Sequence, residues 1–232
     1  MAERAESLPE IRAIVPVKRL GLAKQRMAPV LSQSERTMLA RVMLNDVLAT
    51  LHATPELAGI VVVSSDPMAE ELAKQFEARV VADVVETGAN DAVQQGLATL
   101  DDKTAALVVP ADVPFATVEE LQAVIKSLAQ HDLVLTPARS DGGTNALAMR
   151  ARDLIATSFG EDSFARHVAL AKEKNLRCGI VRCDGLGNDI DRPEDLVFSS
   201  APDRRLLTSA LLAEFDLAAR LSARSSPVRY VT

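Results

Sequence analysis

The sequence predicts an α/β fold in which helices flank a central, mostly parallel sheet. Short apolar runs alternate along the chain with longer segments of helical periodicity, and residues 11–17 and 105–109 are clear examples of the short runs. The second run has no charged residue on either face, which is typical of a strand covered on both sides inside a parallel sheet. Hydrophobic residues make up 48% of the chain and charged residues 25%, which is the composition of a globular protein with a substantial core.

The length and charge of the chain limit its organisation and its partners. Its 232 residues fit one domain, with a core over residues 10–200 and a helical tail over residues 201–232. A net charge of -6 gives no general attraction to nucleic acid or to a membrane surface. No apolar run is long enough to span a membrane, no signal peptide is visible, and Cys178 and Cys183 are unsuited to a disulfide. We therefore expect a cytoplasmic protein with no nucleic-acid partner and no membrane association.

A strand over residues 11–17 is followed by the densest cluster of cations in this acidic chain. The cluster consists of Lys18, Arg19, Lys24 and Arg26. Ser32 and Glu35 then have the spacing of a capping box, and apolar residues every four positions from Leu39 predict a helix to about His52. Strand, basic loop and helix resemble a phosphate-binding βα unit, although the glycine-rich Walker pattern is absent. The alternative is a solvated loop without a ligand.

Further strand–helix units follow in the same pattern. Strands are expected over residues 59–64 and 78–83, and Ser65-Asp66-Pro67 opens a helix between them. Gly88 and Asn90 then lie in a loop that leads into another helix, at the same edge of the sheet as the basic cluster. Asn90 is a candidate for contacting a base or ribose, and the alternative, commoner for Asn in such a loop, is a helix N-cap.

An aspartate follows the central apolar strand directly, in the sequence Pro110-Ala111-Asp112-Val113-Pro114. Ligands of open α/β sheets bind at the carboxyl ends of strands, so Asp112 is a candidate ligand for a metal ion. The alternative is that Asp112 caps the helix expected over residues 117–129. From this stretch alone, both interpretations remain open.

A strand is expected over residues 133–137, and Ser140-Asp141-Gly142-Gly143-Thr144-Asn145 follows it. Paired glycines let a backbone turn tightly and direct N–H groups at an anion, and Thr144 adds a hydroxyl group. The competing interpretation, favoured when these residues are taken alone, is an ordinary hairpin turn at the Asp-Gly pair.

Another helix is expected to begin within residues 159–167. Gly160 and Ser163 fall at its N-terminus, where the helix dipole favours anions. The alternative makes Ser163 an ordinary first-turn residue and His167 a solvated helix position.

The last core strand is expected over residues 179–184, and two aspartates follow it. In an extended segment Asp189 and Asp191 share a face while Ile190 turns inward. The alternative is that Asp191 caps a helix at Pro193 and Asp189 is solvated. Because the aspartate after the central strand is also available, we prefer the interpretation as a metal site.

The C-terminal tail has the periodicity of a helix over residues 204–224. Leu207, Leu211 and Phe215 recur every four positions, which predicts one apolar face. This face has two candidate partners, the sheet of the same chain or a second subunit, so a homodimer is left open.

Five motifs together resemble the guanylyltransferases of coenzyme F420 biosynthesis, a family that uses 2-phospho-L-lactate, phosphoenolpyruvate or 3-phospho-D-glycerate. The resemblance covers roughly residues 10–200. The motifs are Val15-Pro16-Val17-Lys18 with Ala23-Lys24-Gln25-Arg26, Pro110-Ala111-Asp112-Val113-Pro114, Ser140-Asp141-Gly142-Gly143-Thr144-Asn145-Ala146-Leu147, Phe159-Gly160 with Ser163-Phe164, and Asp189-Ile190-Asp191-Arg192-Pro193-Glu194-Asp195-Leu196.

This resemblance implies a Rossmann-like nucleotidyltransferase fold of the GT-A or molybdenum-cofactor guanylyltransferase type. It also implies four groups of site residues. They are Lys18, Lys24, Arg26 and Asp112 for catalysis, Thr144, Gly160 and Ser163 for the acceptor phosphate, Lys18, Lys24, Gly88 and Asn90 for the nucleotide, and Asp112, Asp189 and Asp191 for Mg²⁺. The nucleotide segment departs from the usual Gly-Leu-Asn because Ala89 replaces the leucine.

The implied reaction joins GTP to a small phosphorylated carboxylic acid. A phosphate monoester loses its second proton with a pKa of about 6, so the attacking oxygen is ionised at neutral pH and needs no general base. Two alternatives stay open: a nucleotidyltransferase for another acceptor, such as a molybdopterin or sugar phosphate, and a regulatory module that binds a nucleotide without catalysis. The motifs do not distinguish among the three-carbon phosphoacids.

Overall fold

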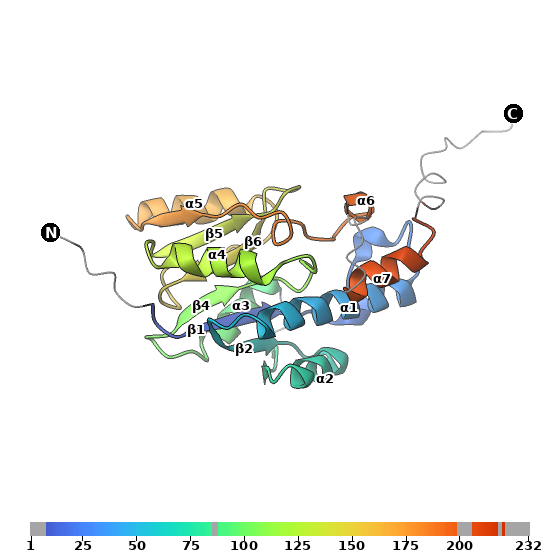
Figure 1. Ribbon diagram of the computed structural model, residues 1–232, viewed down its shortest axis with the longest axis horizontal. Helices are drawn as coiled ribbons and strands as arrows, with labels where there is room; N and C mark the ends of the chain where they lie inside the picture. Colours follow the sequence, from blue (N-terminus) through green and yellow to red (C-terminus); the bar gives the residue numbers. More distant parts are fainter. Residues whose placement is uncertain (1–7, 85–87, 199–205, 218–219, 221–232) are drawn as a thin grey trace, which may run out of the picture.

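Seven strands form one sheet in the computed structural model, which describes residues 8–84, 88–198, 206–217 and 220 (Figure 1). The strands are β1 (Ile11–Pro16), β2 (Leu57–Val63), β3 (Arg79–Val81), β4 (Ala105–Val108), β5 (Leu133–Pro137), β6 (Thr144–Met149) and β7 (Cys178–Ile180). Their order across the sheet is β3-β2-β1-β4-β6-β5-β7. Only β6 runs antiparallel to its neighbours among these strands, so the expected mostly parallel sheet is confirmed.

Helices cover both faces of the sheet, as predicted. They are α1 (Gln33–His52), α2 (Pro67–Gln75), α3 (Ala89–Leu97), α4 (Val118–Leu128), α5 (Ser163–Glu173), α6 (Asp195–Phe198) and α7 (Leu207–Glu214), with short 3-10 helices η1 (Leu20–Leu22) and η2 (Gln25–Met27). α1, α2 and α4 share one apolar core with Leu107, whereas α3 and α5 share another with its neighbour Val108. The central strand is therefore buried on both faces. No helix in the described ranges is long and apolar enough to cross a membrane.

Side-chain caps fix the starts of two long helices. Ser32 and Glu35 form the expected capping box at α1. Thr117 and Glu120 form a second capping box at α4, which satisfies the free N–H groups of its first turn. The interpretation of Asp112 as the cap of α4 is therefore wrong, because Thr117 already fills that role.

The predicted strand over residues 179–184 is shorter than expected. β7 ends at Ile180, although the amide of Val181 still donates to the carbonyl of Leu135 in β5. The next donor would be Pro137, whose ring nitrogen carries no hydrogen, so the ladder stops there. Cys183 lies beyond the strand, and both cysteines are free thiols.

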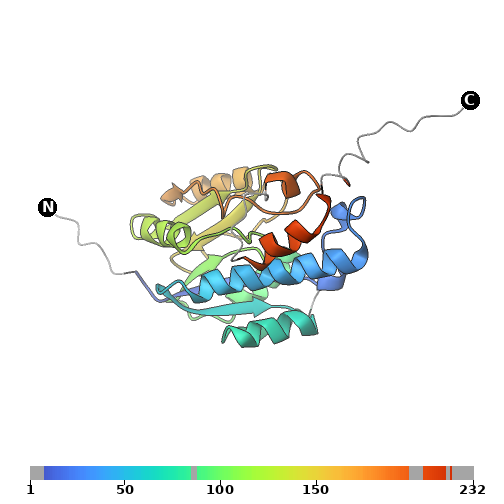
Figure 2. The ribbon, with the colours of Figure 1, turned by 45° about the vertical axis from the view of Figure 1, so that its right-hand side comes forward.

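The described part of the C-terminal tail packs on α1 of the same chain. α7 lies alongside α1 in both views (Figures 1 and 2). Leu211 and Leu212 are buried, whereas Leu207, expected on the apolar face, is 48% exposed. The buried carboxylate of Asp46 in α1 accepts hydrogen bonds from the amides of Leu207 (3.1 Å) and Thr208 (2.8 Å). Most of the expected helix beyond residue 217 lies outside the described residues.

Asp46→Ala is expected to weaken this attachment of α7. The change leaves two amides at the helix N-terminus without their acceptor, which costs about 1–3 kcal/mol of stability. Urea unfolding measures this loss, and Glu71→Ala, at an exposed position of α2, serves as the control with little effect. Equal stability of both variants would contradict a stabilising role for the Asp46 contacts.

Candidate active site

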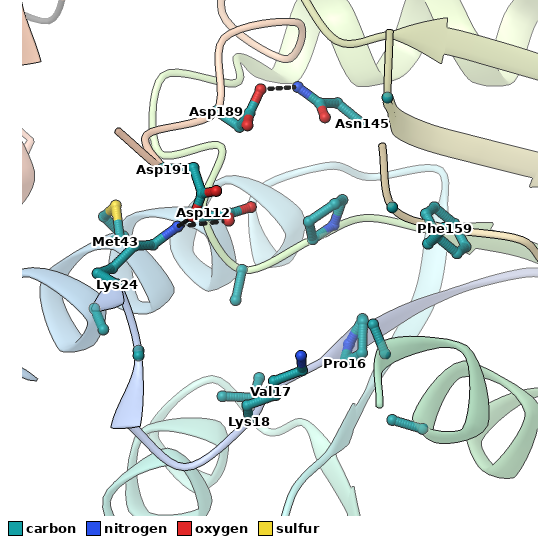
Figure 3. A pocket seen from close by; sticks show the side chains of 18 of the residues that line it. Pro16, Val17, Lys18, Lys24, Met43, Asp112, Asn145, Phe159, Asp189 and Asp191 are labelled. Carbon is teal, nitrogen blue, oxygen red and sulfur yellow. Dashed lines mark hydrogen bonds and ion pairs between the residues drawn. The ribbon is translucent and has the colours of Figure 1, made fainter. Parts of the chain in front are cut away.

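A cavity of about 450 Å³ lies at the carboxyl ends of β1 and β4, beside the hairpin that joins β5 to β6 (Figure 3). Its lining brings together loops that are far apart in the sequence. The site residues predicted from the sequence that line it are Lys18, Lys24, Arg26, Asp112, Thr144, Gly160, Asp189 and Asp191. The remaining predicted residues, Gly88, Asn90 and Ser163, are not in this lining.

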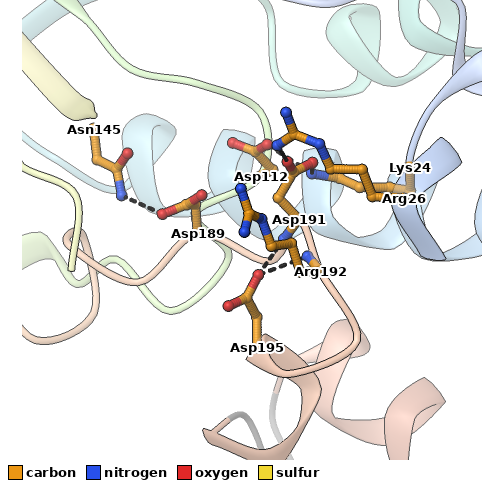
Figure 4. A network of polar contacts seen from close by, with 8 residues as sticks. All are labelled: Lys24, Arg26, Asp112, Asn145, Asp189, Asp191, Arg192 and Asp195. Carbon is orange, nitrogen blue, oxygen red and sulfur yellow. Dashed lines mark hydrogen bonds and ion pairs between the residues drawn. The ribbon is translucent and has the colours of Figure 1, made fainter. Parts of the chain in front are cut away.

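Lys24 is the centre of the polar network in this cavity (Figure 4). Its ammonium nitrogen lies 2.7 Å from Asp112 Oδ2 and 3.4 Å from Asp191 Oδ1, and its side chain is only 7% exposed. Arg26 Nη1 lies 2.5 Å from the other carboxylate oxygen of Asp191, but its side chain is 55% exposed. The interpretation of the basic segment as a solvated loop is therefore wrong for Lys24, whose side chain is buried in the cavity lining.

The charges of this network stabilise one another. Burial alone would lower the pKa of Lys24, but the carboxylates of Asp112 and Asp191 outweigh burial and raise it. Burial alone would raise the pKa of Asp191, but Lys24 and Arg26 outweigh it and lower the pKa. Lys24 and Asp191 therefore remain charged at neutral pH.

Backbone contacts hold the two aspartate-bearing segments together. The amide of Ile190 donates to the carbonyl of Asp112 at 3.0 Å, and the Ile190 side chain is fully buried, as predicted. Asp195 Oδ2 accepts hydrogen bonds from the amides of Asp191 and Arg192 at 2.9 and 2.6 Å. The interpretation of Asp191 as a helix cap is therefore wrong, because Asp195 caps this turn and leaves the Asp191 carboxylate for Lys24.

Asp189 occupies a different environment in the same cavity. Asn145 Nδ2 donates to Asp189 Oδ1 at 3.0 Å. Burial, opposed by this hydrogen bond and reinforced by the charge of Asp112, raises the pKa of Asp189 to about 6. Among Asp112, Asp189 and Asp191, Asp189 is therefore the one without a cation at ion-pair distance in the part of the chain that the structure describes.

The donor chemistry of the cavity suits a hard divalent cation, although no preformed cage is present. In the described ranges, no three or more His, Cys, Asp and Glu side chains converge closely enough to hold a metal ion. Asp112, Asp189 and Asp191 nevertheless line one cavity with carboxylate oxygens, which are the ligands that Mg²⁺ prefers. The ammonium of Lys24 lies between two of them, and Asp189 lacks such a partner.

Another part of the cavity lining comes from the β5–β6 hairpin and from residues 159–161, just before α5. The antiparallel pairing of these strands confirms the interpretation of residues 138–143 as a hairpin turn. Thr144 begins β6, and its Oγ1 accepts a hydrogen bond from Ser163 Oγ at 3.2 Å. Ser163 is fully buried beneath Thr144, so Thr144 lies between Ser163 and the cavity. Gly160, with φ of +122°, adopts a backbone conformation that favours glycine.

His167 is fully buried, and the expectation that it is a solvated helix position is wrong. Its Nδ1 lies 3.0 Å from Thr144 Oγ1, and its Nε2 accepts a hydrogen bond from the Ser158 amide at 2.9 Å. The ring also packs edge-on against Phe159, with centroids 5.3 Å apart. Burial, with a smaller effect of Arg166, lowers the pKa of His167 to about 4.

This shift predicts a loss of stability at mildly acidic pH. The unfolded chain binds a proton at His167 near pH 6.5, whereas the folded chain binds it only near pH 4, so stability rises with pH between these values. We expect a loss of up to about 3 kcal/mol from this group on acidification from pH 7 to pH 4. Urea unfolding across this range should show a smaller pH slope for His167→Gln than for the wild type. The exposed His52, replaced by Gln, is the control, and equal slopes in all three proteins would contradict the prediction.

Asn90 is not a helix N-cap, since α3 begins one residue earlier and Gly88 is its N-cap. Both polar atoms of the Asn90 amide bind the backbone of Phe159: Oδ1 accepts from its N–H at 2.6 Å and Nδ2 donates to its C=O at 3.1 Å. Gly88 lines a smaller neighbouring cavity of about 280 Å³ together with Lys18 and Asp83. Asn90 thus fixes the backbone beside Gly160.

Sequence reasoning missed Asn145, His167 and Asp195 as parts of the site. Asn145 follows Thr144 directly, and an amide beside an apolar strand is a signal that could have been used. The role of His167 depends on contacts with segments that no local pattern reveals, whereas Asp195 binds amides only three and four residues before it, at a spacing that a local pattern could have shown.

An open, mostly parallel sheet with cations and carboxylates gathered at its carboxyl edge is typical of α/β proteins that bind a phosphorylated ligand there. The chain belongs to the family described as "Guanylyl transferase CofC like", whose model matches residues 11–199. It is 37% identical over 191 residues to a phosphoenolpyruvate guanylyltransferase of Sphaerobacter thermophilus, covering 79% of this chain and 89% of that protein. The protein is therefore an enzyme of the nucleotidyltransferase class.

Relatives named for the other acceptors are similar as well. The chain is 37% identical to a 3-phospho-D-glycerate guanylyltransferase of Phenylobacterium zucineum, over 75% of this chain and 83% of that protein. It is 32% identical to a 2-phospho-L-lactate guanylyltransferase of Methanocaldococcus jannaschii, over 81% of each chain. Identity alone therefore does not distinguish the acceptors.

Solved structures agree on the fold. A 4-diphosphocytidyl-2C-methyl-D-erythritol synthase from Anaerococcus prevotii superposes with a TM-score of 0.60 at 15% identity, covering 91% of this chain and all of that one (100%). A glucosyl-3-phosphoglycerate synthase from Mycobacterium tuberculosis, solved with Mn²⁺, uridine diphosphate and phosphoglyceric acid, superposes with a TM-score of 0.58 at 14% identity, covering 95% of this chain and 80% of that one. The predicted nucleotidyltransferase fold is confirmed.

Proposed function

We propose that this protein transfers GMP from GTP to the phosphate of a three-carbon phosphoacid and releases pyrophosphate, as a step in coenzyme F420 biosynthesis. The observation that carries the proposal is the buried Lys24, held between Asp112 and Asp191 in a cavity whose lining also includes Thr144. Such a cavity offers cationic and hydroxyl groups for a triphosphate and a second phosphate. The whole chain acts as one nucleotidyltransferase domain in this proposal.

The reaction needs little covalent chemistry from the protein. An oxygen of the acceptor phosphate forms a bond to the α-phosphorus of GTP as the bond from that phosphorus to the β-phosphate oxygen breaks. The attacking oxygen is already ionised, so the protein must bring two anions together and stabilise the charge on the leaving pyrophosphate. Lys18, Lys24 and Arg26 supply positive charge for this purpose, and positioning of both substrates supplies the rest.

The nucleotide and the acceptor occupy different parts of the cavity in this proposal. Lys18, which lines both cavities, and Gly88, which lines the smaller one, contact the nucleotide together with Lys24. Asn90 orders the same edge of the sheet at the start of α3. Thr144 and Gly160 contact the acceptor phosphate, with Ser163 hydrogen-bonded behind Thr144.

We assign the metal site of this enzyme to Asp112, Asp189 and Asp191, with Mg²⁺ as the ion. The uncompensated carboxylate of Asp189 beside Asp112 supports the assignment, since a cation would relieve their repulsion. When bound, Mg²⁺ supplies positive charge against the triphosphate. The Mn²⁺ in the glucosyl-3-phosphoglycerate synthase structure is consistent with a divalent cation on this fold.

Pyrophosphate release from GTP in the presence of Mg²⁺ tests the function. We expect turnover with one of 2-phospholactate, phosphoenolpyruvate and 3-phosphoglycerate, offered separately, and no more than trace release when CTP or ATP replaces GTP. The product should contain GMP joined to the acceptor phosphate, which mass spectrometry detects. Folded protein that binds GTP but is silent with all three acids would overturn the proposed acceptor class.

A further inference from the structure

The Thr144 hydroxyl is the end point of a buried chain of hydrogen bonds. Ser163 Oγ donates to Thr144 Oγ1 at 3.2 Å, and His167 Nδ1 lies 3.0 Å from the same oxygen. Ser163 and His167 are fully buried and are not in the cavity lining, whereas Thr144, although only 4% exposed, is part of that lining. The two buried groups therefore act on the ligand side of the cavity only through Thr144.

The tautomer of His167 follows from its other contact. The amide of Ser158 can only donate, and it points at Nε2 from 2.9 Å, so Nε2 carries no hydrogen. In a neutral imidazole the hydrogen must then be on Nδ1, which makes His167 the donor to Thr144 Oγ1.

Thr144 Oγ1 thus accepts two hydrogen bonds, one from Ser163 and one from His167. A hydroxyl oxygen has two lone pairs and one hydrogen, so its acceptor capacity is filled and its own hydrogen is left to donate. Both buried partners donate to this oxygen, so neither offers a lone pair to its hydrogen, and the cavity that Thr144 lines is where an acceptor can be bound. We propose that His167 is a positioning residue that turns the hydroxyl of Thr144 into an obligate donor to an anionic oxygen of the acceptor.

Neighbouring contacts keep the imidazole in this orientation. Its edge-on contact with Phe159 limits rotation of the ring, and Asn90 binds both backbone polar groups of Phe159. A rotated ring would also leave the Ser158 amide without its acceptor, which is costly in this partly buried position. The same contacts order the backbone that carries Gly160, so one hydrogen-bonded unit prepares both proposed contacts to the acceptor. This inference rests on the proposed function.

Two substitutions separate the two nitrogen atoms of His167. Asparagine places an amide near the position of Nδ1 and can still donate to Thr144, whereas glutamine reaches the position of Nε2 and keeps only the contact with Ser158. We expect His167→Gln to raise the KM for the acceptor about tenfold or more, with kcat and the KM for GTP within about threefold of the wild type. His167→Asn should restore most of the acceptor affinity.

A double-mutant cycle tests whether His167 acts through the hydroxyl. Thr144→Val removes the hydroxyl at nearly constant volume and is expected to raise the acceptor KM about tenfold to a hundredfold. In Thr144→Val, adding His167→Gln should then cause no further rise, because the group that His167 orients is gone. Circular dichroism confirms that each variant is folded.

Nitrogen-15 NMR of the histidine side chains tests the tautomer without any substrate. The chain has three histidines, so the signal absent from His167→Gln identifies His167. We expect the Nδ1–H form at neutral pH, and an Nε2–H form would overturn the inference. The inference would also be overturned if the effects of Thr144→Val and His167→Gln on the acceptor KM were additive. An acceptor KM for His167→Gln equal to that of an active wild type would overturn it as well. A wild type inactive with all three acids would instead defeat the proposed function and, with it, the role of His167 toward the acceptor.

Discussion

Lys24→Met is expected to lower turnover by about a thousandfold or more and to destabilise the fold. Methionine has a similar length but leaves Asp112 and Asp191 facing one another without the ammonium that lies 2.7 and 3.4 Å from them. Removing one partner of a buried ion pair costs about 3–5 kcal/mol of folding stability. We expect a loss of about 3 kcal/mol here, at the lower end, because the Asp112 and Asp191 side chains are 30% and 32% exposed. The loss in rate follows from the missing charge against the phosphates.

Urea unfolding and pyrophosphate release measure these two effects. Arg26→Met is the matched control, because Arg26 contacts Asp191 as well but is 55% exposed, so its ion pair contributes about 1 kcal/mol or less. Mg²⁺ should restore part of the stability of Lys24→Met, since a cation can replace the ammonium between the carboxylates. Equal stability losses in the two variants, or a Lys24→Met protein with turnover near that of the wild type, would contradict a central role for Lys24.

Much of the fold follows from local signals in the sequence. The apolar run of β4, the capping box of Ser32 and Glu35 and the alternation around Ile190 each depend on neighbouring residues alone. The position of Asp112 at the end of a buried strand made it a candidate for a site at that edge but left a helix cap open; the structure places Asp112 in the cavity, where the topology of a parallel sheet brings strand ends together.

The functions of individual side chains in the network depended on distant contacts. The sequence pattern around His167 is that of an ordinary helix, and only the docking of α5 against the start of β6 buries its ring beside Thr144. Asn90 has the local features of an N-cap, but its amide binds Phe159, 69 residues away in the chain. Such pairings are set by tertiary packing, which no local periodicity encodes.

Strand ends were predicted less well for a similar reason. The apolar run after Cys178 continues to Val181, yet β7 stops at Ile180 because its neighbour β5 ends in a proline. A ladder needs a donor on both strands, so the length of one strand is decided by the sequence of another.

Asp112→Asn is expected to reduce turnover by about a thousandfold or more while leaving the protein folded. The change keeps the size of the side chain and an oxygen that can accept from Lys24, which also retains Asp191 at 3.4 Å. Stability should therefore change far less than in Lys24→Met. The proposed metal site, however, loses one of its carboxylates, and an uncharged amide is a much weaker ligand for Mg²⁺.

Two measurements decide between a metal ligand and a purely structural partner of Lys24. If Asp112 binds Mg²⁺, the Mg²⁺ concentration needed for half-maximal turnover should rise in Asp112→Asn, whereas a structural partner would change stability instead. Asp102→Asn is the control, since Asp102 pairs with Arg152 at 2.6 Å on the surface and is 86% exposed. Near-normal turnover of Asp112→Asn at ordinary Mg²⁺ concentrations would remove Asp112 from the metal site. The case for catalysis by Lys24 would survive that result, because the position of its ammonium is also fixed by Asp191.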